Sequence, residues 1–200
     1  MTPIHPIEVE SYRVLAGRAD LSGWPAGQRE VVARMIHATA DLGFATSARI
    51  GPEAVTRALE ALSRGAPVVV DAAMVAAGVP RVETTCLLAE VPEAPPGSTR
   101  SAAAIGLAAH RHPEGALWLI GNAPTALVEL LTLHERGDVE PAAVIGLPVG
   151  FVGAAAAKAA LWAGPLGARA ITNVGERGGS AVAAAVLNAL QRLGQGEEPC

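Results

Sequence analysis

The chain has 200 residues, of which 50% are hydrophobic, 17% are charged and 3% are aromatic. A single domain of this length buries roughly 70% of the surface of its unfolded chain, so it needs no disulfide or metal to hold its core together. Lys and Arg total 15 against 19 Asp and Glu, and the net charge of −4 disfavours a general nucleic-acid binder, which needs a basic surface.

Cysteine content and hydropathy argue against an exported or membrane protein. Cys86 and Cys200 are the only cysteines, which disfavours a disulfide framework or a cysteine-based zinc site. The longest apolar stretch, 142–157, is interrupted by Gly and Pro and is shorter than the ~20 residues of a spanning helix. The N-terminus has acidic residues where a secretory signal has basic ones. We therefore expect a cytoplasmic protein without a membrane segment.

The first third of the chain is predicted to be helical, because its apolar residues recur every three to four positions. One such stretch includes Tyr12 and Leu15, and the next includes Val31 and Met35. Pro25 fits the first position of the second helix, where a missing N–H costs nothing.

From Gly65 onward, short apolar runs bounded by Gly and Pro alternate with alanine-rich helical patterns. Apolar strands that alternate with helices are typical of a parallel sheet covered on both faces. We expect an α/β fold with a single domain over residues 1–193, in which N-terminal helices precede a mostly parallel central sheet with helices on both faces. We expect a disordered tail over 194–200. The predicted strands are 67–71, 84–90, 116–121, 142–147 and 168–174.

Three loops after predicted strands, 120–127, 145–153 and 174–182, are rich in Gly and small residues and open predicted helices. Open α/β sheets bind ligands beyond the carboxyl ends of their strands, and free N–H groups at helix starts attract anions. The three loops could therefore form an anion-binding surface, although their Gly and Pro residues could equally serve only to make tight turns. The loops lack the phosphate-binding and dinucleotide motifs, so we expect no nucleotide cofactor.

His37 is the most informative titratable residue, because it lies beside the apolar stripe of the second helix with Asp41 one turn later. A histidine held in one tautomer by such a partner can exchange a proton near neutral pH. The alternative is a histidine at the edge of the core that is satisfied by a carbonyl. The other histidines are predicted to lie on the surface, without a third ligand for a metal site; they are His5, His110, His112 and His134.

Four cations lie beside predicted helix starts or Gly loops and are candidate carboxylate ligands: Arg13, Arg100, Lys158 and Arg177. The alternative for each is a solvated surface charge. Asp71, at the end of a predicted strand, could accept hydrogen bonds at the edge of the sheet or could cap the following helix.

Seven segments follow one another in order over nearly the whole chain: IEVESYRVL (7–15), VVARMIHATADLGFA (31–45), VVVDAAMVAAGV (68–79), STRSAAA (98–104), IGNAPTAL (120–127), PAAVIGLPVGFVGAAAAK (141–158) and ERGGSAVAAAVLNAL (176–190). Together they resemble the precorrin-8X methylmutase family, the precorrin isomerases of cobalamin biosynthesis.

The resemblance implies a homodimeric α/β isomerase that moves a methyl group between neighbouring carbons at ring C of precorrin-8X or cobalt-precorrin-8. In the metal-free case the product is hydrogenobyrinic acid. The implied reaction is a 1,5-sigmatropic shift within one molecule, so it needs no methyl donor, nucleotide or metal cofactor. The resemblance also leaves room for handing the product to the next corrinoid pathway enzyme.

The family's catalytic histidine corresponds to His37 in the RMIHAT string, where it is expected to protonate the macrocycle. Ser11 falls at a substrate-contacting serine of the family, and Arg13 is its near neighbour. The substrate carries many acetate and propionate groups, so we expect its carboxylates to meet polar residues near the helix starts. These residues are Arg100, Ser101, Asn122, Thr125, Lys158, Arg177 and Ser180.

The chain departs from the usual family pattern at three positions, with Ala73 at a usual arginine and Ala156 and Ala157 at a usual Glu and Ser. These departures bear on fine specificity and leave the reaction class unchanged. Two other functions remain open. One is a carrier that binds hydrogenobyrinic acid without catalysis, and the other is a nucleotide-dependent α/β enzyme.

Overall fold

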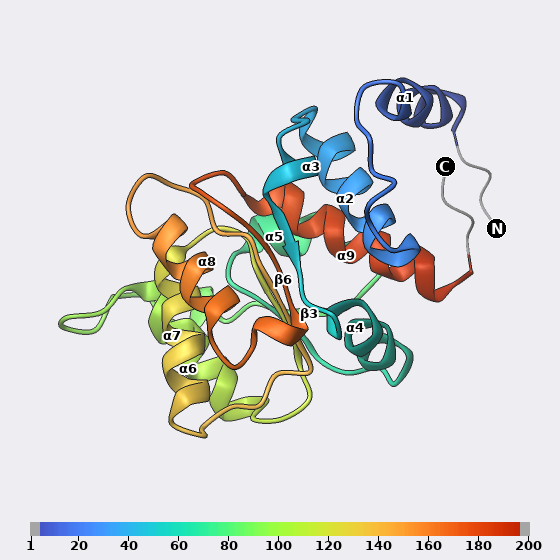
Figure 1. The fold of residues 1–200 in the computed structure, drawn as a ribbon. Coiled ribbons are helices and arrows are strands. Elements are labelled where there is room, and N and C mark those ends of the chain that lie inside the picture. The colour runs from blue at the N-terminus through green and yellow to red at the C-terminus, as the bar shows by residue number, and fades with distance from the viewer. Residues whose placement is uncertain (1–4, 197–200) are drawn as a thin grey trace.

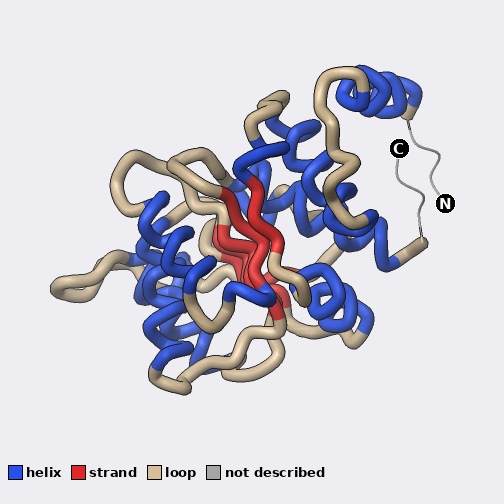
Figure 2. Tube along the Cα trace, in the orientation of Figure 1, coloured by secondary structure: helices blue, strands red, loops and turns tan. Residues whose placement is uncertain are grey.

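The computed structural model describes residues 5–196, and residues 1–4 and 197–200 lie outside the described range. Within that range a six-stranded sheet runs through the centre of the molecule in the order β1-β6-β5-β4-β2-β3 (Figures 1 and 2). Neighbouring strands are parallel except that β1 pairs with β6 in the antiparallel orientation. The strands are β1 (Ala48–Ile50), β2 (Val68–Val70), β3 (Thr84–Thr85), β4 (Leu117–Ile120), β5 (Ala143–Gly146) and β6 (Ala170–Asn173).

Helices cover both faces of the sheet (Figure 1). One face packs against α6 (Arg100–Arg111), α7 (Pro124–Glu135) and α8 (Ala154–Ala163). The other face packs against α2 (Ala26–Thr39), α4 (Ala54–Ser63), α5 (Ala73–Ala77) and α9 (Ser180–Gly194). The remaining helices are α1 (Pro6–Ala16), α3 (Phe44–Ser47) and two short 3₁₀ turns at Leu88–Glu90 and Gly167–Arg169.

Alternation along each strand divides the core into two layers. In β2, Val68 and Val70 join the core beneath α2 and α9, whereas Val69 joins the core beneath α6 and α7. All three valines are essentially unexposed, and burying one such side chain contributes roughly 1.5–3 kcal/mol. A strand with two buried faces must be apolar throughout, which is why the valine run was recognisable in the sequence.

The structure confirms the predicted fold class and most of the predicted strands. The prediction of a strand over 84–90 was wrong beyond Thr85, because the chain then turns into the 3₁₀ segment Leu88–Glu90. Pro25 is the N-cap of α2 and not its first residue. Strand β1 was not predicted. Residues 197–200 of the expected tail lie outside the described residues. The expected start of the tail at 194 was wrong, because Gly194 is the last residue of α9.

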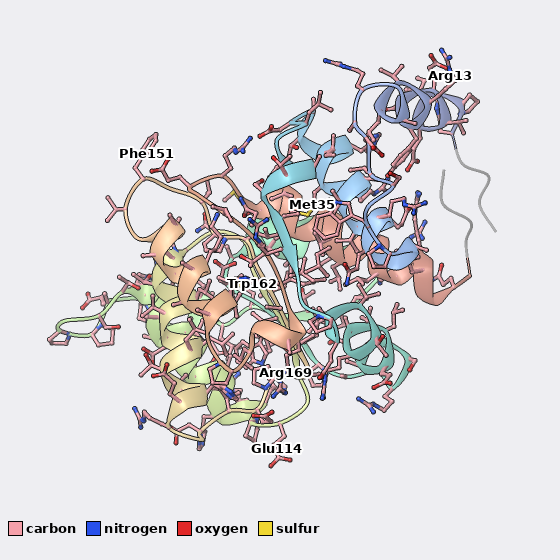
Figure 3. The ribbon with its side chains drawn as sticks, viewed as in Figure 1. Arg13, Met35, Glu114, Phe151, Trp162 and Arg169 are labelled. Atoms are coloured by element: carbon pink, nitrogen blue, oxygen red, sulfur yellow. The ribbon has the colours of Figure 1, made fainter. Side chains whose placement is uncertain are left out.

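Strands β4, β5 and β6 are adjacent and parallel, so the loops at their carboxyl ends lie along one edge of the sheet. We call these loops, 121–123, 147–153 and 174–179, the rim. In Figure 3, Phe151 of the rim lies at the upper left, and Glu114 lies at the bottom, far from the rim. None of the helices in the described range combines the length and apolar character that a membrane span requires.

Candidate functional site

His37 lies near the C-terminal end of α2, against two consecutive residues of α1. Its Nδ1 is 2.9 Å from Ser11 Oγ. Its ring stacks on the Tyr12 ring, with 4.8 Å between the ring centres and 6° between the ring planes. Because Ser11 and Tyr12 approach one ring from the same helix, the docking of α1 fixes the orientation of the imidazole. With Nδ1 bonded to Ser11, Nε2 is the nitrogen available to a ligand.

Two arginines and one glutamate surround this pair of rings. Arg34 Nη1 donates to Glu8 Oε1 at 2.5 Å and to the Tyr12 hydroxyl at 3.0 Å. Arg192 Nη1 donates to the same Glu8 oxygen at 3.0 Å. Burial alone would raise the pKa of Glu8, but the bonds from the two arginines outweigh it and hold that pKa below its ordinary value. The glutamate is therefore ionised and binds α1 to α2 and α9.

The pKa of His37 is lowered, first by partial burial and then by the charge of Arg34, with Glu8 opposing the shift. An unperturbed histidine titrates near 6.5, so His37 is mainly neutral at pH 7 in the free protein. A neutral imidazole whose Nδ1 meets a hydroxyl can take up and deliver one proton at Nε2. Negative charge arriving nearby would favour the protonated form.

The sequence-based pairing of His37 with Asp41 was wrong. Helix α2 ends at Thr39, and Ala40 adopts a left-handed conformation with φ of 54°, which turns the chain out of the helix before Asp41. Asp41 instead accepts two hydrogen bonds from Arg177, at 2.7 and 2.8 Å, and one from the Gly43 N–H at 2.8 Å.

His37 opens on a groove of about 550 Å³ between α1, α2 and α9. The wall of the groove on α9 consists of small side chains, including Ala181, Ala184 and Ala185, so a broad apolar ligand meets little obstruction there. A smaller hollow of about 110 Å³ lies beside His37 and Ser11. The imidazole is therefore accessible and is not enclosed by aliphatic side chains.

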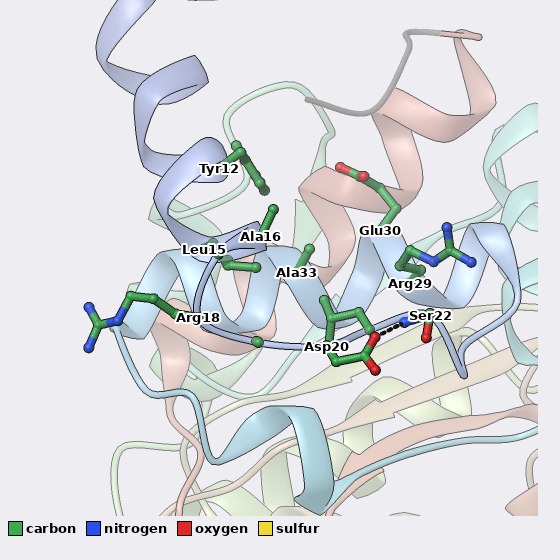
Figure 4. Close-up of a pocket in the computed structure, with 12 residues that line it drawn as sticks. Tyr12, Leu15, Ala16, Arg18, Asp20, Ser22, Arg29, Glu30 and Ala33 are labelled. Carbon is green, nitrogen blue, oxygen red and sulfur yellow. Dashed lines mark hydrogen bonds between the residues drawn. The ribbon is translucent and has the colours of Figure 1, made fainter.

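A larger hollow, of about 730 Å³, lies elsewhere, beneath the loop between α1 and α2 (Figure 4). Tyr12 borders it, together with Arg29 and Glu30, but His37 does not. Size alone therefore does not identify the reactive site, and we place the site in the groove that contains the titratable imidazole.

Asp71 organises one loop of the rim. Its carboxylate accepts hydrogen bonds from the backbone N–H groups of Gly121, Asn122 and Ala123 at 2.9, 2.9 and 2.7 Å. Of the two roles left open for Asp71, the structure confirms hydrogen bonding at the edge of the sheet, since no side chain caps α5. These bonds hold the backbone of 121–123 immediately before α7.

Lys158 contacts Arg177, a residue of the third rim loop. Lys158 is 1% exposed, and its ammonium donates to Asn173 Oδ1 at 3.0 Å and to the Arg177 carbonyl at 2.5 Å. Burial first, and then the charge of Arg177, lowers the pKa of Lys158 to about 8. The sequence predicted a cation beside a Gly loop, and Lys158 does contact the third rim loop. Its charged group is buried beneath that loop, however, and is not open to a ligand.

The remaining candidates fall into separate groups. Thr125 bonds Thr99 at 2.8 Å, which joins the starts of α6 and α7. Arg100 donates to the carbonyls of Val91 and Leu88, at 2.6 and 3.1 Å, and so closes the base of the preceding loop.

Further candidates differ in how accessible they are. Ser101 and Asn122 are half-buried. Ser180 lies at the start of α9 with a buried hydroxyl that has no partner among the described residues. Arg13 points outward from α1 and pairs with Glu10 (Figure 3).

Glu8, Arg34 and Arg192 were missed as site residues. Part of the signal was present in the sequence, since Arg34 and His37 are three positions apart and share one helix face. Glu8 and Tyr12, four positions apart in α1, likewise share one helix face. Nothing local, however, indicates that Arg192 binds a residue 184 positions away.

His134 was wrongly assigned to the surface. Its Nδ1 is 3.0 Å from the Val139 carbonyl and 3.2 Å from a Glu140 carboxylate oxygen, and the side chain is only 13% exposed. His5 and His110 are exposed, and His112 is partly exposed. Within residues 5–196, no group of three His, Cys, Asp or Glu side chains is placed to hold a metal ion.

Comparison with known proteins gives a consistent result over nearly the full length. The family model for precorrin-8X methylmutase matches residues 6–193. A precorrin-8X methylmutase of Sinorhizobium sp is 40% identical over 195 residues, covering 92% of each chain. A cobalt-precorrin-8 methylmutase of Priestia megaterium is 34% identical over 197 residues, covering 94% of this chain and 87% of the relative. The crystal structure of precorrin-8x methyl mutase from Thermus thermophilus has a TM-score of 0.84 at 36% identity, covering 96% of this chain and 97% of that one.

Proposed function

The chain belongs to the precorrin-8X methylmutase family, and from this premise we propose that it isomerises precorrin-8X or cobalt-precorrin-8 by moving a methyl group at ring C of the macrocycle. Relatives that are named for each of the two substrates support the activity, which makes the protein an isomerase of cobalamin biosynthesis. The observation that carries the mechanism is the accessible imidazole of His37, oriented by Ser11 and Tyr12 at a groove lined by alanines.

In the proposed reaction, His37 Nε2 donates a proton to the macrocycle. The bond from the methyl group to one ring carbon breaks as the bond to the neighbouring carbon forms, in a 1,5-sigmatropic shift. The proton then returns to His37, so substrate and product have the same atoms. Because His37 is mainly neutral in the free protein, it must gain this proton. The carboxylates of the bound substrate favour that gain by placing negative charge nearby.

The rim supplies a second part of the proposed site. Helices α7, α8 and α9 all begin there. The N–H groups just before α7 are already bonded to Asp71, whereas α8 and α9 have no side-chain cap, so their free N–H groups can receive carboxylates. We propose direct contacts to substrate from side chains at or near these helix starts and the start of α6, and from Ser11. The rim-side residues are Arg100, Ser101, Asn122, Thr125, Arg177 and Ser180. Lys158 would act indirectly, by holding the loop that carries Arg177. Arg13 would contact substrate only after its ion pair with Glu10 breaks.

The test of the catalytic role is His37→Ala, assayed with precorrin-8X by the change in its absorption spectrum. General acid catalysis contributes ~10²–10⁴-fold, so we expect a loss of that size in kcat while hydrogenobyrinic acid still binds. His110→Ala is the matched control, since His110 is exposed on α6, and it should retain full activity. Full turnover by His37→Ala would remove His37 from the mechanism. A wild-type protein that binds hydrogenobyrinic acid but leaves the precorrin-8X spectrum unchanged would be a carrier.

We also propose that the protein acts as a homodimer and passes its product to the next enzyme of the pathway. Phe151 and Val152 of the rim are adjacent and are 91% and 89% exposed, and contiguous exposed apolar side chains are typical of interaction surfaces. Light scattering should give twice the chain mass of 20.2 kDa. A mass of one chain at micromolar concentration would contradict the dimer.

A further inference from the structure

We propose that Arg34 is a positioning residue for His37, acting through the Tyr12 ring that its guanidinium holds in place. This inference rests on the proposed function, in which His37 is the proton donor. Arg34 touches neither the imidazole nor, in the proposed reaction, the migrating methyl group. Its effect passes through Glu8 and Tyr12 of α1.

The geometry gives Arg34 two points of attachment on one helix. Its Nη1 reaches both the Glu8 carboxylate and the Tyr12 hydroxyl, which lie one turn apart on α1. The Arg34 and Glu8 side chains are only 15% and 20% exposed, so water competes weakly for these bonds. Holding the hydroxyl stops the phenol ring from sliding across the imidazole on which it stacks.

The same attachment places Ser11, which is adjacent to Tyr12 and bonds His37 Nδ1. The carboxylate of Glu8 is shared with Arg192 of α9, so α1 is bound to two helices at once. Removing Arg192 would leave the Tyr12 hydroxyl in contact with Arg34. Of the two arginines, Arg34 is therefore the one that connects this ion pair to the stacked rings.

Arg34 also contributes charge at the imidazole. The charged groups that face His37 are Glu8 of α1, Arg34 of α2 and Arg192 of α9, and His5 and Arg18 line the two hollows beside it. Burial is the largest cause of the lowered pKa of His37, and the Arg34 charge is the next. Position and charge can be separated experimentally, because lysine keeps the charge but its ammonium ends one bond short of Nη1, the nitrogen that donates to both acceptors.

Three variants separate the two effects. Arg34→Lys keeps the positive charge but is too short by one bond to reach both acceptors as Nη1 does. Tyr12→Phe keeps the ring and loses the hydroxyl, and Arg34→Met loses both charge and bonds. Arg111→Met is the matched control, because Arg111 makes a comparable two-bond ion pair with Glu90 on the surface, away from His37. Each variant is examined by an NMR titration of the His37 ring in the free protein and by kcat and KM with precorrin-8X.

We expect kcat to fall at least about tenfold in both Arg34→Lys and Tyr12→Phe, with KM changed less than twofold, since a 1 Å misplacement can cost ~10²-fold. The NMR midpoint of His37 should stay below 6.5 in these two variants, which keep the charge. In Arg34→Met the midpoint should rise, and the activity of that variant should persist to higher pH. Arg111→Met should match the wild type in every measurement.

The proposal is overturned if Tyr12→Phe retains the wild-type kcat, or if Arg34→Lys raises KM alone, which would make Arg34 a direct substrate ligand. A fall in kcat without any change of the His37 midpoint in Arg34→Met would overturn the electrostatic part. If Arg34→Met does not fold, the other two variants still decide the positioning role. If the wild type shows no isomerase activity, the proposed function fails, whereas the NMR titration still reports on Arg34 and His37.

Discussion

The buried ammonium of Lys158 is a single charged group whose surroundings decide its role. It has two hydrogen-bond acceptors, Asn173 Oδ1 and the Arg177 carbonyl, and Asn173 Nδ2 donates to the same carbonyl at 3.0 Å. The carbonyl of one rim residue is thus held by two buried side chains. The Arg177 guanidinium in turn binds Asp41, just beyond the helix that carries His37. Lys158 therefore stabilises the link between the rim and α2.

The lowered pKa of Lys158 predicts a pH dependence of stability. Between about pH 8 and 10.5 the unfolded chain still binds a proton that folded Lys158 has released, so the free energy of unfolding should rise with pH in this window. Relative to Lys158→Met, the wild type should gain on the order of 2–3 kcal/mol across it. Urea unfolding at a series of pH values measures the difference. The exposed Arg64→Met serves as control, and a wild-type minus Lys158→Met difference that does not vary with pH would contradict the role of Lys158.

Two loops of the rim pack backbone against backbone, which makes them one structural element. The Gly179 N–H donates to the Leu147 carbonyl at 2.8 Å, and the Gly150 N–H donates to the Glu176 carbonyl at 3.1 Å. A Cβ on Gly178 would lie 2.3 Å from the Leu147 oxygen and 2.6 Å from the Pro148 oxygen. Glycine is therefore required at this close approach.

Gly178→Ala should separate the two loops. We expect a loss of about 1–3 kcal/mol in the free energy of unfolding, typical of overpacking, together with a raised KM for precorrin-8X. Gly106→Ala is the matched control. Gly106 lies inside α6, and a Cβ there would meet only a Glu129 oxygen of α7, at 3.8 Å. That control should stabilise the protein by roughly 0.5–1 kcal/mol, as alanine does in a helix. Equal stability of the two variants, by urea unfolding, would show that the loops are not tightly joined.

Sequence patterns predicted the elements whose burial is evident from the hydrophobicity of their own residues. Strands β2, β4 and β5 have two buried faces and therefore read as continuous apolar runs. Strand β6 is equally buried, but Thr172 and Asn173 make its second half polar. Strand β1 has only three residues, and its partner β6 lies about 120 positions away, so no local periodicity indicates it. The run 84–90 misled because its leucines follow a two-residue edge strand and enter a 3₁₀ turn.

For the site, the resemblance and the helical spacing led to His37. The resemblance also singled out Ser11, whose hydroxyl lies 2.9 Å from His37 Nδ1 in the structure. The partner of His37 could not be derived from spacing, because the left-handed Ala40 redirects Asp41. The ion pairs around Glu8 join residues 26 and 184 positions apart. Contacts over such distances depend on how α1, α2 and α9 pack, and a single sequence does not specify that packing.

Across the whole molecule, α1 stands apart from the sheet and contacts the body through α2 and α9 (Figure 1). Glu8 is the residue that joins these three helices. The first and last helices of the described chain are thus connected by one carboxylate, which also sets the position of Ser11 and Tyr12. Loss of its charge should release α1 without unfolding the sheet.

Glu8→Gln tests this connection. The lowered pKa of Glu8 means that its contribution to stability is present above the unfolded value of 4.5 and is lost as pH falls through the folded value. We expect the variant to be less stable than the wild type by about 1.5–3 kcal/mol at pH 7, as for hydrogen bonds to a charged group, and the gap to close as the pH falls below 4.5 and through the folded value. Urea unfolding across this range measures the gap, and hydrogen exchange at pH 7 should be faster in α1 of the variant than in β4.

Glu10→Gln, on the same helix but exposed, should change little, because surface ion pairs contribute weakly. Equal stability of the two variants at pH 7 would mean that apolar packing alone, through Tyr12 and Leu15, holds α1 in place.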